Sequence, residues 1–202
     1  MEQRRAARRQ SRTWRSQAAA APPAPNPDLE TALTAHLPAV PRWTKPRTAI
    51  VMLNRRCNLR CAFCDHWEHR DELPAGAVHA LIDQAGDVGV ELLVLTGGEP
   101  FLRRDLFEII DRARDKGLTV NVTTNGTLLQ RRIRLLMAHP PHSISVSIDG
   151  LEPTHDDLRG RPGTAERAWS GLERLRRDTD IALNVYFVVT RRNVGELIPV
   201  HD

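Results

Sequence analysis

The stretch TAIVMLNRRCNLRCAFC, residues 48–64, decides the fold, because an apolar run typical of a buried strand leads directly into a loop with three cysteines. Cys57, Cys61 and Cys64 are all the cysteines of the chain, and they lie within eight consecutive residues. An odd, clustered set argues against a disulfide framework. It indicates a metal site in a protein of a reducing compartment.

The spacing of these cysteines favours an iron–sulfur cluster over other sites. A loop at the end of a strand can direct three thiolates onto one cluster, and a cubane held by only three leaves one iron open to another ligand. A zinc site that adds His66 or His69 remains an alternative, because structural zinc accepts three cysteines and one histidine. Zinc knuckles, however, usually start with two cysteines and find the other pair further along the chain. Packing as small buried side chains is the least favoured interpretation.

Beyond this stretch, apolar runs alternate with amphipathic segments along the chain. This alternation is typical of buried parallel strands covered by helices. Right-handed crossovers curl such a sheet into an arc. The sequence therefore predicts an α/β fold, a partial (β/α) barrel of parallel strands with outer helices. Strands are expected at 48–53, 91–95, 118–123, 143–148 and 181–189, and helices at about 78–85, 106–113, 128–137, 165–176 and from Val194 onward.

Polar motifs follow three of these strands. LTGGEP (95–100) follows the second, TTNG (123–126) the third, and SVSIDG (145–150) ends the fourth. Taken singly, the first two motifs are also typical of ordinary turns. In strand alternation Ser145, Ser147 and Asp149 share one face. Parallel α/β folds assemble active sites from loops at the carboxyl ends of their strands, so the sequence predicts one site there.

These motifs together resemble the radical SAM superfamily. The cysteine spacing is similar to its CxxxCxφC motif, with aromatic Phe63 before the last cysteine, and Gly97-Gly98-Glu99 is similar to its GGE motif. The resemblance implies that the cysteines hold a [4Fe-4S] cluster, which binds S-adenosylmethionine (SAM) at its open iron. Glycine backbone and the Glu99 carboxylate would then hold the SAM ammonium group. The cofactor-binding residues implied are Phe63, Gly97, Gly98, Glu99, Thr124, Asn125, Ser147 and Asp149, and no general base is assigned.

The activity implied by this resemblance is reductive cleavage of SAM. An electron donor such as flavodoxin or ferredoxin would reduce the cluster, and a 5′-deoxyadenosyl radical would abstract hydrogen from an unknown peptide or small-molecule substrate. The family core usually has six βα units, of which about five are expected here, and no cysteine follows Cys64 to hold an auxiliary cluster. An inactive truncated fragment and a zinc-binding interaction module therefore remain alternatives.

Two other segments each have two interpretations. HDDLRG (155–160) resembles a loop that follows the fourth strand in peptide- and cofactor-modifying branches of the family, where Arg159 could reach a carboxylate. A charged surface loop is an interpretation that the sequence supports at least as well. Asp65, His66 and Trp67 directly follow the cluster motif and could line a substrate entrance, although Trp67 could also serve packing alone.

Composition sets the remaining expectations. The chain has 202 residues and a net charge of +4, but six arginines against Glu2 give +5 within residues 1–15, so the remainder is near −1. We expect residues 1–46 to form a disordered segment, Arg-rich and then Ala/Pro-rich, and residues 47–202 to form an incomplete radical SAM core domain. The Arg-rich start could also contact RNA or an acidic partner, or act as a transit peptide. We expect a cytoplasmic protein without a membrane span or nucleic-acid partner.

Overall fold

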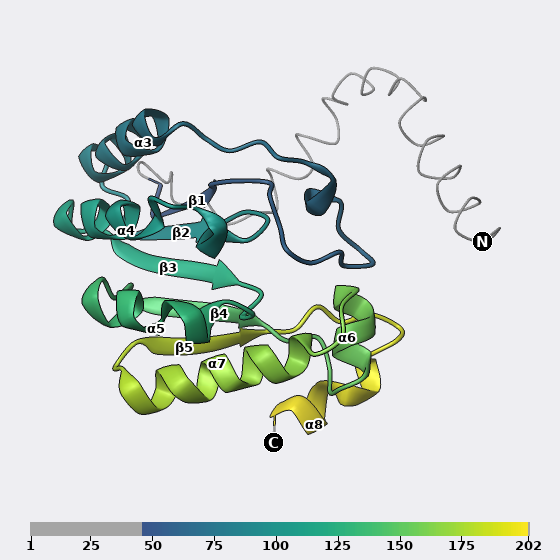
Figure 1. Cartoon of the computed structure of the whole chain (residues 1–202). Coiled ribbons are helices and arrows are strands. Elements are labelled where there is room, and N and C mark those ends of the chain that lie inside the picture. Colours follow the sequence, from purple (N-terminus) through teal and green to yellow (C-terminus); the bar gives the residue numbers. More distant parts are fainter. Residues whose placement is uncertain (1–45, 202) are drawn as a thin grey trace, which may run out of the picture. The chain divides into compact units, whose positions relative to one another are not determined.

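A computed structural model describes residues 46–201, which form a five-stranded sheet with helices packed along it (Figure 1). The strands are hydrogen-bonded in chain order, and every neighbouring pair is parallel. This confirms the α/β class and the five predicted strands. The strands are β1 (Thr48–Met52), β2 (Leu92–Thr96), β3 (Thr119–Thr124), β4 (Ser143–Ser147) and β5 (Ala182–Tyr186).

Each connection between consecutive strands contains a helix of ten residues or more, as the apolar spacing predicted. The long helices are α3 (Ala75–Asp87), α4 (Leu106–Asp115), α5 (Leu129–Ala138) and α7 (Thr164–Asp178). The short elements are α6 (Thr154–Arg159), α8 (Leu197–His201) and the 3₁₀ turns η1 (His66–Glu68), η2 (Pro100–Leu102) and η3 (Val194–Glu196).

Helix α6 corrects the expectation of a charged surface loop at 155–160. His155, Asp156 and Arg159 are buried there. The Asp156 carboxylate accepts hydrogen bonds from the backbone N–H groups of Thr164 and Ala165, both at 2.8 Å, at the start of α7. A carboxylate at a helix N-terminus is satisfied by orphan N–H groups, so this charged segment can be buried.

The core lies on the helix-covered face of the sheet. One residue from each strand forms a row across it, because the register pairs Val51 with Leu95, Leu95 with Val122, Val122 with Ile144 and Ile144 with Leu183. The first four of these side chains are buried and belong to one apolar cluster with residues of the long helices. Burial of this face fixes the strand register, since a shift by one residue would turn the row to the other face.

The opposite face of the sheet is polar across β3 and β4. Asn121 donates hydrogen bonds from its side-chain amide to the hydroxyls of Ser143, at 2.7 Å, and Ser145, at 3.0 Å. On β1 the same face leaves Ile50 71% exposed. This face is therefore not packed as a second apolar core within the described residues.

All five strands point the same way, so their carboxyl ends meet at one edge. The loop that follows β1, residues 53–73, and helix α6 both lie beyond the arrowheads at this edge (Figure 1). We call residues 53–73 the cysteine loop. Among the helices of residues 46–201, none is long and apolar enough to cross a membrane. The expectation for the N-terminal segment concerns residues 1–45 almost entirely, which lie outside the described residues.

Candidate functional site

One pocket at this edge gathers most of the predicted site residues. It is lined by the three cysteines and by the ends of β2, β3 and β4. The predicted residues at the pocket are Cys57, Cys61, Phe63, Cys64, Gly97, Gly98, Thr124, Asn125 and Ser147, with Leu59, His66, Trp67, Thr96, Thr123 and Arg159 beside them. Glu99 and Asp149 are fully buried behind this lining.

The three thiols are free and differ in exposure. Cys57 and Cys61 are half-buried, whereas Cys64 is exposed. Burial raises the pKa of Cys57 to about 11, and burial also raises the pKa of Cys61, against the opposing effect of the nearby Arg159 charge. Both thiols are therefore protonated at neutral pH in the metal-free protein, and metal binding must displace their protons.

The three thiols are a donor set that a cubane cluster accepts. Among residues 46–201, no three His, Cys, Asp or Glu side chains are gathered closely enough to hold one metal ion. A cubane binds each ligand sulfur at a different iron and so accepts sulfurs that are further apart. Three thiols around one shared pocket match that donor set.

The two glycines of the GGE motif let the cysteine loop approach. A Cβ atom on Gly98 would collide with the backbone carbonyl oxygens of Arg55 and Arg56. Gly97 adopts φ +152°, and a Cβ atom there would collide with the backbone carbonyl oxygen of Asn54. Backbone bonds join the same segments, because Gly98 N–H donates to Asn54 O at 2.8 Å. The expected reason for these glycines was close approach to a ligand, whereas the structure shows close approach to the cysteine loop.

Glu99 connects the ends of β2 and β3. Its carboxylate accepts hydrogen bonds from Phe101 N–H (3.1 Å), the Thr124 hydroxyl (2.8 Å) and Asn125 N–H (2.9 Å). Burial raises the pKa of Glu99, while these three donors oppose that shift. The carboxylate thus holds two pocket residues, Thr124 and Asn125, in place from behind.

An amide network joins the cysteine loop to the end of β3. Asn125 donates from its side chain to the Asn58 amide oxygen at 3.0 Å and lies 3.8 Å from the Cys57 sulfur. Asn58 in turn donates to the Thr127 hydroxyl at 2.9 Å. Asn58 was not among the predicted site residues, although its position directly after Cys57 could have indicated it.

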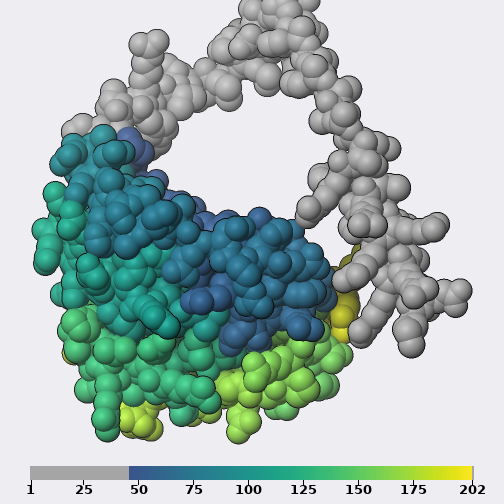
Figure 2. Space-filling view, turned by 45° about the horizontal axis from the view of Figure 1, so that its top comes forward, coloured from purple at the N-terminus to yellow at the C-terminus, as the bar shows by residue number. Residues whose placement is uncertain are grey.

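Helix α6 places a buried cation beside the thiols. Arg159 forms an ion pair with Asp149 at 2.7 Å, lies 3.9 Å from the Cys61 sulfur, and stacks over the Phe63 ring at 5.6 Å. Backbone N–H groups of Arg60 and Ala62 donate to carbonyls of α6, so the cysteine loop lies directly against this helix. In Figure 2 the loop, in blue, borders a light green surface, the colour that the bar gives to the residues of α6.

Asp149 links Arg159 to the segment that follows β5. Its carboxylate also accepts a hydrogen bond from Val188 N–H at 2.9 Å, beyond the end of β5. Its own N–H donates to the His155 ring at 3.0 Å, and burial lowers the pKa of His155 to about 4. The neutral imidazole is therefore the form that accepts this bond near pH 7.

Trp67 lines the pocket beside the cysteines. Its indole N–H donates to the Cys64 carbonyl at 3.0 Å, and the Arg60 guanidinium stacks over its ring at 5.2 Å. Both predicted roles of this residue, pocket lining and packing, are thus compatible with its position.

Comparisons with known proteins agree with this geometry. The model of the Radical SAM superfamily matches residues 51–198. AdoMet-dependent heme synthase of Methanosarcina barkeri is 39% identical over 159 residues, 75% of this chain and 45% of the relative. PqqA peptide cyclase of Rhizobium meliloti is 33% identical over 164 residues, 78% of this chain and 44% of the relative.

A solved structure shares the fold. Streptococcus suis SuiB bound to S-adenosylmethionine matches 79% of this chain and 38% of its own, with a TM-score of 0.68 at 21% identity. This chain spans less than half the length of each of these three proteins. The parallel sheet with three thiols at its carboxyl edge is the architecture of a radical SAM domain, and the chain belongs to the Radical SAM superfamily.

Proposed function

We propose that residues 47–202 form a radical SAM core that holds a [4Fe-4S] cluster on Cys57, Cys61 and Cys64 and binds SAM beside it. The observation that carries this proposal is the single pocket that the three thiols share with the strand ends. Three ligands leave one iron of a cubane open to a further ligand. When bound, the cluster supplies the electron for reductive cleavage of SAM, which starts hydrogen abstraction from the substrate.

The pocket lining supplies contacts for such a ligand. We assign SAM binding to Phe63, to the backbone of Gly97 and Gly98, and to Thr124, Asn125 and Ser147, which all line the pocket. Arg159 adds a guanidinium whose side chain is 9% exposed, suited to a carboxylate.

Two buried carboxylates have a supporting role in this proposal. Glu99 holds Thr124 and Asn125, and Asp149 holds Arg159. Direct contact of either carboxylate with SAM stays a prediction.

The exposed part of the pocket suits exchange with partners. Cys64 is exposed, and Phe63 beside it is 46% exposed, so a cluster held here is within reach of a docked donor such as flavodoxin or ferredoxin. The substrate we propose is a peptide or a small molecule. Both classes are represented among the names of the relatives, a peptide cyclase and a heme synthase.

Anaerobic reconstitution tests the cluster. The protein is incubated with iron and sulfide, desalted and analysed, and we expect about four iron and four sulfide per chain. The dithionite-reduced protein should give an EPR signal that changes when SAM is added. A Cys57→Ala variant should lose both results. Zinc bound at one per chain with no retained iron would contradict the proposal and favour the zinc-binding module, and a cluster that does not respond to SAM would favour an inactive fragment.

A further inference from the structure

A short backbone pairing joins the two ends of the cysteine loop, residues 53–55 and 71–73. We call these paired ends the neck of the loop. Leu73 N–H donates to Leu53 O at 3.0 Å, and Arg55 N–H donates to Asp71 O at 2.8 Å. Two such bonds are few for a loop that brings three thiols together, because an isolated two-stranded pairing is only marginally stable in water. The neck therefore depends on other groups.

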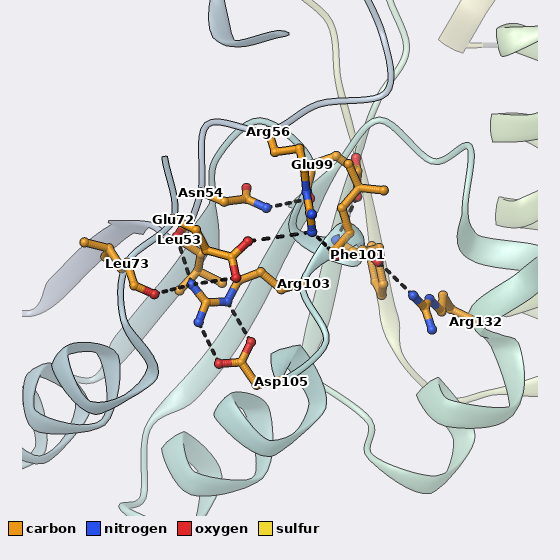
Figure 3. A network of polar contacts seen from close by, with 11 residues as sticks. Leu53, Asn54, Arg56, Glu72, Leu73, Glu99, Phe101, Arg103, Asp105 and Arg132 are labelled. Carbon is orange, nitrogen blue, oxygen red and sulfur yellow. Dashed lines mark hydrogen bonds and ion pairs between the residues drawn. The ribbon is translucent and has the colours of Figure 1, made fainter. Parts of the chain in front are cut away.

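Arg103 contacts both sides of this neck (Figure 3). Its Nη1 donates to Leu53 O at 3.0 Å and to Leu73 O at 2.8 Å. Leu53 is the first residue of the cysteine loop and Leu73 the last. One guanidinium nitrogen thus bridges the two ends of the loop.

The other nitrogens of Arg103 bind a carboxylate. Nε and Nη2 donate to the two oxygens of Asp105, at 2.8 and 2.6 Å. This bidentate bond holds the pKa of Asp105 below its usual value. The Arg103 side chain is only 1% exposed, and a buried guanidinium is tolerated only when it is paired and hydrogen-bonded. Asp105 therefore fixes the orientation in which Nη1 reaches the neck.

The position of Arg103 in the chain couples the neck to the pocket wall. It lies four residues after Glu99, at the end of the segment whose glycines line the pocket. Along this segment Glu99 N–H donates to Arg56 O at 2.9 Å, one residue before Cys57. The first residues of the segment 97–103 thus bind the backbone of Asn54 and Arg56. Its last residue, Arg103, binds both sides of the neck.

We propose that Arg103 is a positioning residue that holds the neck of the cysteine loop closed, so that the three thiols face the pocket before a cluster is assembled. This role rests on the proposed function only for the identity of the group that the thiols bind. Arg104, the next residue, is exposed, and it provides a matched control of the same type.

The experiment compares wild type with Arg103→Met and Arg104→Met in the metal-free, fully reduced protein. All cysteines of the chain lie in the cysteine loop, so alkylation by iodoacetamide followed by mass spectrometry reports on this loop alone. In wild type we expect Cys64 to react first, because Cys57 and Cys61 are half-buried. In Arg103→Met we expect Cys57 and Cys61 to react about tenfold faster or more, and in Arg104→Met at the wild-type rate.

The same three proteins are then reconstituted at a temperature at which circular dichroism shows all of them folded. Arg103→Met should retain less iron and give an altered EPR signal in the presence of SAM, a readout that general destabilisation of a folded protein does not change. Wild-type alkylation rates together with wild-type iron content in Arg103→Met would overturn the proposal. If Arg103→Met does not fold, Arg103→Lys carries the same test, because an ammonium keeps the charge without the planar fork. A third outcome is that wild type binds no cluster while Cys57 and Cys61 still react faster in Arg103→Met than in wild type. This outcome would contradict the proposed function and support the role of Arg103.

Discussion

Replacement of Glu99 by glutamine tests whether this buried carboxylate is a structural connection between β2 and β3. Its three donors include two backbone N–H groups, of Phe101 on one oxygen and of Asn125 on the other. Glutamine offers one oxygen and one NH2 group. In either orientation of the amide, the NH2 group therefore faces a backbone N–H that loses its acceptor.

The expected cost follows from that loss. A buried donor without a partner costs about 1–3 kcal/mol, and bonds to charged acceptors lie in the upper part of that range. A loss of about 2 kcal/mol lowers the Tm of a domain of this size by roughly 4–8 °C. The change is measured by thermal melting of the metal-free protein, so it does not depend on cluster content.

Glu91→Gln is the matched control. Glu91 pairs with Arg47 at 2.6 Å, but both side chains are more than half exposed. Water screens an exposed ion pair, so its loss changes stability little, and this variant should melt close to wild type and above Glu99→Gln. An unchanged or higher Tm for Glu99→Gln would refute the reasoning, because it would show that removal of the buried charge offsets the lost hydrogen bond.

Two further predictions concern the glycine contact and the buried histidine. Gly98→Ala should lower the stability by about 1–3 kcal/mol and impair iron retention, because its Cβ meets the backbone of the cysteine loop. The control Gly76→Ala has open space in α3 and should leave the Tm unchanged or higher. Equal melting and iron content of the two variants would contradict this prediction. His155 is buried with a pKa of about 4, against 6.5 when unfolded, so the unfolded chain binds more protons between these values and stability falls as the pH is lowered through this window. Urea unfolding should show wild type losing roughly 2 kcal/mol more between pH 7 and pH 5 than His155→Asn, and parallel pH profiles of the two proteins would argue against the assignment.

The strands and long helices could be predicted because their periodicity is strong. The row Val51, Leu95, Val122 and Ile144 comes from apolar runs that only a buried sheet explains. The cysteine motif and the strand-end motifs also lay where parallel α/β folds place a site.

Helix α6 was less predictable because most of its residues are polar or charged. Whether Asp156 faces water or caps α7, and whether Arg159 faces water or Asp149, depends on partners that only the fold brings close. Arg103 and Arg104 show the same limit. They are chemically identical neighbours, yet one is buried at the neck of the cysteine loop and the other is exposed.

The central claim is that the three cysteines support cleavage of SAM. The most direct test is formation of 5′-deoxyadenosine by anaerobically reconstituted protein with dithionite and SAM, measured by chromatography against the triple variant with Cys57, Cys61 and Cys64 each replaced by alanine. We predict that wild type forms 5′-deoxyadenosine and that the triple variant forms none. Equal amounts of product from both proteins, or none from a wild type that holds its cluster, would contradict the account.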